Sequence, residues 1–168
     1  MYHMPYRVPM RVYLLAFLVL VIANIYVYRA VYAAPALEVQ VFTVGKGNAA
    51  LVRTPTHKTL LIDAGSDASI LRALGAVLPM WQRRIDAVVL TSSDSRSIGG
   101  LPEVTHRYHT PTPVRYGGDT PYGTPLVFDT DTHVTVAAPH ALTISYGTSA
   151  ITISSSTPAG IYRFSGTD

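Results

Sequence analysis

The chain has 168 residues, 14% of them charged and 48% hydrophobic, and a formal net charge of +3 at pH 7. This length accommodates one domain of modest size plus an appendage. The absence of Cys excludes disulfides and thiolate metal sites. The basic residues form no run, so composition does not favour nucleic-acid binding.

An apolar segment near the N-terminus predicts a transmembrane helix. Residues 12–28 are apolar throughout apart from Asn24. As a helix they would extend about 26 Å, slightly less than a hydrocarbon core of about 30 Å. Residues 30–34 can lengthen the span if the Arg29 side chain reaches the headgroups. We therefore expect an anchor over residues 12–34.

Residues flanking this segment predict its orientation. Arg7 and Arg11 precede the span and Arg29 follows it, which favours a short cytoplasmic N-terminus over residues 1–11 and an extracytoplasmic domain after a single pass. Six of the eleven Tyr flank or lie inside the segment, as in an aromatic interface belt. A cleaved signal peptide and a core helix are the alternatives. The apolar run is longer than the 7–15 residues usual in signal peptides, which favours the anchor.

The rest of the chain alternates between strand and helix patterns. Pro35 ends the apolar helix. Residues 67–78 carry apolar side chains at helical spacing, with Asp67 as a candidate N-cap, and we expect Trp81 to pack over the end of this helix. Residues 100–108 predict a short helix. Strands are predicted at residues 37–44, 49–53, 59–63, 85–90, 114–116, 126–128, 133–137, 142–146 and 150–153. Residues 111–125 predict a loop, and residues 154–168 an irregular tail.

A polar segment follows the most apolar predicted strand, residues 85–90. In open α/β sheets ligands lie beyond the carboxyl ends of such strands, so a site is expected at residues 91–97. Its serines suggest a nucleophile, but a catalytic Ser needs a base within hydrogen-bond reach and no His is near in sequence, which favours a polar loop. Asp63 similarly follows a strand. It predicts either a carboxylate near the site or a turn residue that binds backbone amides.

Residues 91–100, Thr-Ser-Ser-Asp-Ser-Arg-Ser-Ile-Gly-Gly, resemble the metallo-β-lactamase signature Thr-His-x-His/Asp-x-Asp-His followed by Ile-Gly-Gly. Asp94 matches one ligand position of that signature. Ser92, Arg96 and Ser97 stand where the family has His, Asp and His. Serine hydroxyls are poor zinc ligands at neutral pH, and an Arg side chain cannot deprotonate to bind a metal. We therefore expect no metal at these motif positions.

The match extends beyond the motif. Residues 37–108 resemble the C-terminal domain of bacterial DNA-uptake (competence) channel proteins of the ComEC type, through Val-Phe-Thr-Val-Gly-Lys-Gly-Asn-Ala at 41–49 and Leu-Ile-Asp-Ala-Gly at 61–65. Thr43 and Asn48 replace family Asp residues. The resemblance implies that residues 37–168 form an α/β domain, a metallo-β-lactamase-like αββα sandwich or a reduced or truncated version of it.

The implied function is that of a membrane-anchored relative of DNA-uptake proteins that is catalytically inactive and needs no cofactor. Its partners would be the membrane and DNA or other uptake components. The remnant site would contain Asp63, Asp94 and Arg96, with the guanidinium in place of the cation and paired to either carboxylate. One alternative is a zinc-dependent phosphodiester hydrolase whose unconventional ligands include His106 and His109, which share a helix face, together with Glu103 or Asp94. Another is a surface nucleic-acid-binding module.

Overall fold

The computed structural model describes residues 9–31 and 36–165, and the chain divides into two compact units, Met1–Ala34 and Pro35–Asp168. Helix α1, Met10–Val31, belongs to the first unit. Its stretch Met10–Tyr28 has a mean hydropathy of 2.2, and none of it is buried. One N-terminal helix long and apolar enough to cross a membrane is therefore confirmed. The orientation of this helix stays a prediction. Residues 1–8 of the expected cytoplasmic N-terminus and residues 32–34 of the expected anchor lie outside the described residues.

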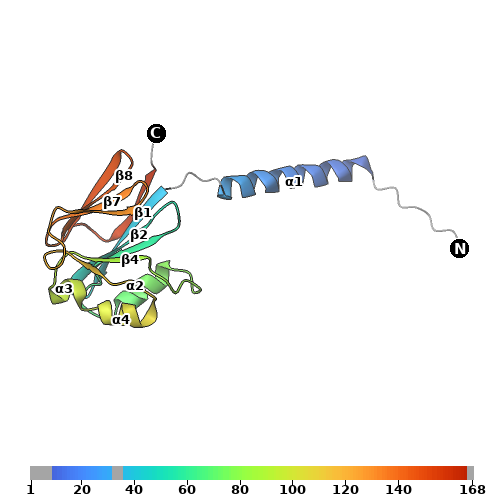
Figure 1. The fold of residues 1–168 in the computed structure, drawn as a ribbon. Coiled ribbons are helices and arrows are strands. Elements are labelled where there is room, and N and C mark those ends of the chain that lie inside the picture. The colour runs from blue at the N-terminus through green and yellow to red at the C-terminus, as the bar shows by residue number, and fades with distance from the viewer. Residues whose placement is uncertain (1–8, 32–35, 166–168) are drawn as a thin grey trace. The chain divides into compact units, whose positions relative to one another are not determined.

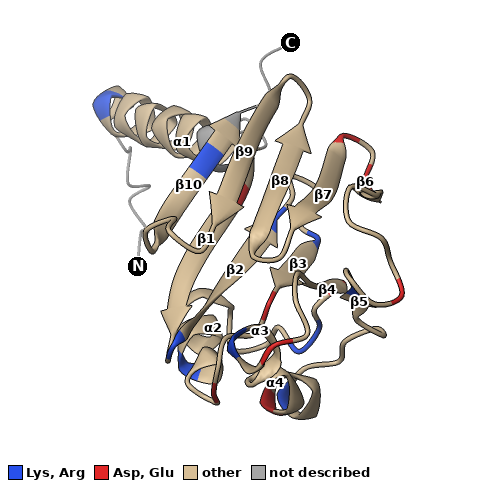
Figure 2. Cartoon of the chain, turned by 90° about the vertical axis from the view of Figure 1, so that its left-hand side faces the viewer, with Lys and Arg blue, Asp and Glu red and all other residues tan. Residues whose placement is uncertain are grey.

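The second unit contains two β-sheets (Figures 1 and 2). The larger has the strand order β10-β1-β2-β3-β4-β5, in which β3, β4 and β5 are parallel and the other pairs antiparallel. Its strands are β1 Ala36–Val44, β2 Gly47–Arg53, β3 Thr59–Ile62, β4 Ala87–Leu90, β5 Val114–Arg115 and β10 Gly160–Ser165. The smaller, antiparallel sheet contains β6 Pro125–Asp129, β7 Thr132–Ala138, β8 Ala141–Tyr146 and β9 Ser149–Ser154.

Within residues 36–165, three helices complete this unit: α2 Ile70–Val77, α3 Ser95–Ile98 and α4 Leu101–Arg107. One apolar core joins the two sheets, with Val41 and Leu60 on one side and Val134 on the other. The second core joins the opposite face of the larger sheet to α2 and α4, and contains Leu61 and Leu74. Neighbouring residues Leu60 and Leu61 thus enter different cores, because successive strand side chains point to opposite faces.

The layers are helix, sheet, sheet, and the α/β class with two stacked sheets is confirmed (Figure 1). Of the two helical layers of an αββα sandwich, residues 36–165 contain the one on the larger sheet, which corresponds to the reduced form. The reason lies in the connections: β6 to β9 follow one another through tight turns, so no segment between them is long enough for a covering helix.

The prediction of an irregular tail over residues 154–168 is wrong for residues 160–165. This segment forms β10 and pairs antiparallel with β1, from Ala36↔Ser165 to Val41↔Gly160. Tyr162 and Phe164 pack against the core between the sheets. The Ser- and Gly-rich residues around them conceal this short alternation in the sequence.

Two local expectations near α2 are also wrong. Trp81 is 83% exposed and does not cover the helix end, which instead buries Leu78 and receives a hydrogen bond from the Arg53 guanidinium to Val77 O. The N-cap position of α2 is Ser69. The Asp67 carboxylate accepts the Ser69 N–H at 2.8 Å from outside the helix.

Candidate functional site

Polar side chains from both sheets meet at one edge of the second unit. Asp63 follows β3 and residues 91–97 follow β4; because these strands are parallel, their carboxyl ends share an edge. His140 reaches the same place from the turn between β7 and β8. A pocket of about 480 Å³ opens beside them. Its polar lining includes Lys46, Asn48, Asp63, Arg96, Ser97 and His140, and its apolar wall includes Val41, Leu142 and Ile153.

Asp63 joins the ends of β3 and β4. Its carboxylate accepts the Thr91 N–H at 2.8 Å and the Thr91 hydroxyl at 2.6 Å, while its own N–H donates to Val89 O. The side chain is buried and the backbone is left-handed, with φ of 54°, a conformation that Asp tolerates better than most residues. Burial raises the pKa of Asp63 to about 6, although the Thr91 hydrogen bonds and the charge of His140 act in the opposite direction.

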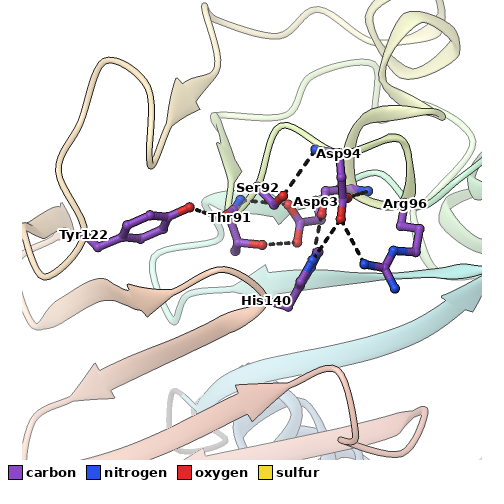
Figure 3. Close-up of polar contacts among 8 residues, drawn as sticks. Asp63, Thr91, Ser92, Asp94, Arg96, Tyr122 and His140 are labelled. Atoms are coloured by element: carbon purple, nitrogen blue, oxygen red, sulfur yellow. Dashed lines mark hydrogen bonds and ion pairs between the residues drawn. The ribbon is translucent and has the colours of Figure 1, made fainter.

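Asp94 binds three donors from the protein. Its Oδ1 accepts the Ser97 N–H at 3.1 Å, which caps α3. Its Oδ2 lies 3.2 Å from Arg96 Nη2 and 3.0 Å from His140 Nε2 (Figure 3). Partial burial by itself would raise the pKa of Asp94, but the Arg96 hydrogen bond, the charge of His140 and the Ser97 N–H together lower it below its usual value.

His140 is the site residue that the sequence analysis missed. It occupies a two-residue turn, flanked by the pair Ala138↔Ala141, with φ of 58°. Its Nδ1 lies 3.4 Å from the Ser97 hydroxyl. Gly and Asn are the usual residues at such turn positions. A His at this turn position is unusual and could indicate a functional residue, but the sequence alone does not show that residues 139–140 form the turn.

The contacts Ser97–His140–Asp94 follow the order of a nucleophile, a base and an orienting acid. However, Ser97 is only 1% exposed, so a substrate carbonyl has no access to its hydroxyl in this arrangement. Asp94 is also shared with Arg96. The geometry is therefore that of a polar bridge between α3 and the smaller sheet.

The structure does not bring the alternative metal ligands together. Glu103 and His106 lie exposed on α4, and His109 lies exposed beyond its end, where its backbone bridges to Arg84. Within residues 9–31 and 36–165, no three His, Cys, Asp or Glu side chains form a group that could hold a metal ion. Asp94, His106 and His109 therefore do not form a joint site.

Of the three residues expected at the site, Asp94 and Arg96 pair with each other and Asp63 does not join them. Arg96 contacts Asp94 and not Asp63, and the exposed fractions of the two paired side chains are 62% and 34%. Asp63 contacts Thr91 in the buried part of the same edge. Thr91 O in turn accepts the Tyr122 hydroxyl at 3.2 Å (Figure 3). The structural role inferred for the Arg96–Asp94 pair stays a prediction.

Arg96→Ala tests that role. Because the pair is exposed, we expect the free energy of unfolding to fall by less than about 1 kcal/mol, and the pKa of Asp94 to rise, since a hydrogen-bonded cation is lost. Chemical denaturation and carboxyl NMR titration measure the two effects. Arg72→Ala, at an exposed position of α2, is the matched control. A loss well above about 1 kcal/mol would show that Arg96 supports the fold.

The fold and site define a two-sheet α/β domain with a polar pocket at the sheet edge. Comparison of the chain with protein-family models found no match, and comparison with curated proteins found none. Among solved structures it is similar to a protein from Cronobacter sakazakii (Enterobacter sakazakii) described as a metallo-β-lactamase with a HARLDQ motif. The sequence identity is 15% and the TM-score 0.43, over 62% of this chain and 57% of that one. The chain thus matches little more than half the length of that structure.

Proposed function

We propose that this chain is a membrane-tethered relative of the ComEC-type DNA-uptake domains that lacks metal-dependent hydrolysis and uses the remnant site to bind an anionic group. One observation carries the proposal: the carboxylate of Asp94, at a metal-ligand position of the resembling motif, is bound by Arg96, His140 and the Ser97 N–H. The Arg96 guanidinium and the His140 imidazole stand where the resemblance implies a metal ion.

Electrostatics supports the loss of metal binding. A divalent ion near Asp94 would have to displace the Arg96 guanidinium, whose charge is permanent and repels cations. Hydrolysis by this fold family depends on a metal-bound water as nucleophile. Without three neighbouring ligands, the described residues offer no way to hold such a metal.

The pocket supports binding of an anion. Lys46 and Arg96 line it together with Asn48 and Ser154, whose side chains carry donors that suit a phosphate or carboxylate. Apart from the adjacent Arg83 and Arg84, the other Lys and Arg residues described in the second unit are scattered and form no stripe (Figure 2). A small anionic group, such as the phosphate of a DNA end or of an uptake component, therefore fits better than an extended nucleic-acid surface.

Helix α1 supports the tether. Its length and hydropathy suit a single membrane span, and both apolar cores lie entirely within residues 37–164. The second unit therefore has what it needs to fold by itself, and α1 is free to serve as an anchor. In this proposal the pocket belongs to an extracytoplasmic domain held at the membrane.

Metal content tests the proposal. Residues 36–168, purified without a histidine tag, incubated with excess zinc and then dialysed, should retain far less than one zinc per chain. The positive control is the triple variant Ser92→His, Arg96→Asp, Ser97→His, which rebuilds the ligand positions around Asp94 and should retain zinc. Elemental analysis measures both. One or two zinc ions held by the unmodified chain would contradict the proposal and support a hydrolase with unconventional ligands.

A further inference from the structure

The loop that follows α2 presents two large apolar side chains to solvent. Met80 is 87% exposed and Trp81 is 83% exposed. They are adjacent, and Trp81 is the only Trp in the chain. Tryptophan combines a large apolar ring with a polar N–H, and is therefore enriched where proteins meet the membrane interface. An exposed Met-Trp pair in a domain that follows a candidate membrane helix suggests a contact with lipid.

Strand register places this loop at the end of the larger sheet where β1 begins. Glu38 near the start of β1 pairs with Arg53, and Arg53 pairs with Thr59 at the start of β3. The loop is attached at this same end, because Gln82 Nε2 lies 3.4 Å from Thr59 Oγ1 and the Arg53 guanidinium donates to Val77 O. The candidate site lies at the opposite ends of β3 and β4, beyond Ile62 and Leu90.

The covalent chain sets how far this end can be from a bilayer that holds α1. Only residues 32–35 separate α1 from β1, and a chain of that length spans at most about 18 Å. The end of the sheet that carries Met80 and Trp81 would therefore be the membrane-proximal end. We propose that Met80 and Trp81 insert among the lipid headgroups of the membrane that holds α1, so that the pocket opens away from the lipid. This inference rests on the tether of the proposed function.

Charge indicates which lipid the loop prefers. Arg83 and Arg84 follow Trp81 and are both exposed. Arg84 Nε lies 3.1 Å from Asp86, whereas Arg83 makes no ion pair with any residue in the described part of the chain. A guanidinium next to an inserted Trp complements an anionic headgroup. The surface therefore fits a bilayer that contains acidic phospholipid.

Trp81 fluorescence tests the inference directly, because no other Trp contributes to the signal. The full chain is reconstituted in vesicles of phosphatidylcholine and phosphatidylglycerol in equal parts, with and without brominated acyl chains. Brominated lipid should quench Trp81 strongly. In the matched control, Trp81→Phe with Lys46→Trp, the reporter lies on the β1–β2 turn at the opposite end of the sheet and should be quenched several-fold less.

The outcomes separate docking from tethering. If the chain floats with the vesicles but Trp81 is not quenched, the proposed insertion of Met80 and Trp81 is wrong and the tether still holds. The same conclusion applies if Trp81 is unquenched and its emission shifts to the blue, because a second copy of the chain then covers it. A chain that does not float with the vesicles overturns the tether itself. Arg83→Gln should reduce the quenching in the mixed vesicles, and unchanged quenching would overturn the preference for acidic lipid.

Discussion

Asp63→Asn is expected to remove about 3 kcal/mol of pH dependence from the stability of the second unit. Burial raises the pKa of Asp63 from 3.8 to about 6 in the folded chain. Each of these roughly two pH units corresponds to about 1.4 kcal/mol. Asn can occupy the same left-handed backbone conformation and can still accept the Thr91 N–H. The substitution therefore removes the charge with little change in geometry.

The sign follows from proton linkage. Below about pH 3.8 both the folded and the unfolded chain hold the proton, and the contribution of Asp63 to stability is fully present. As the pH rises the unfolded chain releases the proton first, so stability falls, and the loss is complete above about pH 6. The free energy of unfolding of the unmodified chain, minus that of Asp63→Asn, should therefore decrease by about 3 kcal/mol from pH 3 to pH 7. Carboxylates present in both chains cancel in this difference.

Urea denaturation of residues 36–168 across this pH range measures the effect. Asp86→Asn is the matched control, because the Asp86 carboxylate accepts the N–H and the hydroxyl of Thr59 just as Asp63 accepts those of Thr91. Asp86 lies just before β4, and its side chain is 29% exposed, whereas Asp63 is buried. The idea that burial controls the pH dependence would be contradicted by either of two results. The difference in unfolding free energy between the unmodified chain and Asp63→Asn could be independent of pH, or the difference for Asp86→Asn could change with pH by the same amount.

The parts of the site close together in sequence could be predicted, because local geometry determines them. Arg96 lies two residues from Asp94 in the same turn, and the strand ends that carry Asp63 and Thr91 follow from the apolar runs before them. His140 could not be placed, because it is 46 residues from Asp94 and reaches it only through the stacking of the two sheets. A single sequence contains no signal for the distance between two sheets.

The same distinction explains the errors in the fold. Strand β10 was missed because its partner is β1, at the other end of the domain, and pairing over that distance leaves only a short alternation in the sequence. Trp81 was misplaced because an aromatic residue beside a helix end normally predicts packing. Trp81 is instead exposed to solvent, which indicates that its partner is not part of the domain, and this exposure is the basis of the proposed lipid contact.

Gly100→Ala is expected to destabilise the second unit by about 3 kcal/mol. Gly100 lies at the N-terminus of α4, and a Cβ there would overlap Ala64 O and lie 2.7 Å from both Asp67 O and Ile70 Cγ2. Two of these three atoms belong to the backbone and cannot rotate away, so the loop after β3 would have to move. That loop begins at Asp63, and the substitution should therefore also weaken the hydrogen bonds between Asp63 and Thr91.

Gly75→Ala is the matched control. Gly75 lies inside α2, where an added Cβ would have no atom within 4 Å apart from its chain neighbours and the helix's own backbone, and Ala there should stabilise the helix by about 0.5–1 kcal/mol. Urea denaturation of the two variants should thus give changes of opposite sign. Equal effects would mean that the loop after β3 can shift at no cost.

The outcome also decides what the resemblance to the metallo-β-lactamase signature means. The residues that carry it include Gly99 and Gly100, and added Cβ atoms there would meet the carbonyl oxygens of Ser66 and Ala64. Gly47 packs in the same way against Arg96 O. These close approaches are between backbones and need no metal ion. If Gly100→Ala destabilises the domain as expected, packing alone explains the glycines of this frame, whatever residues stand at the ligand positions of the motif.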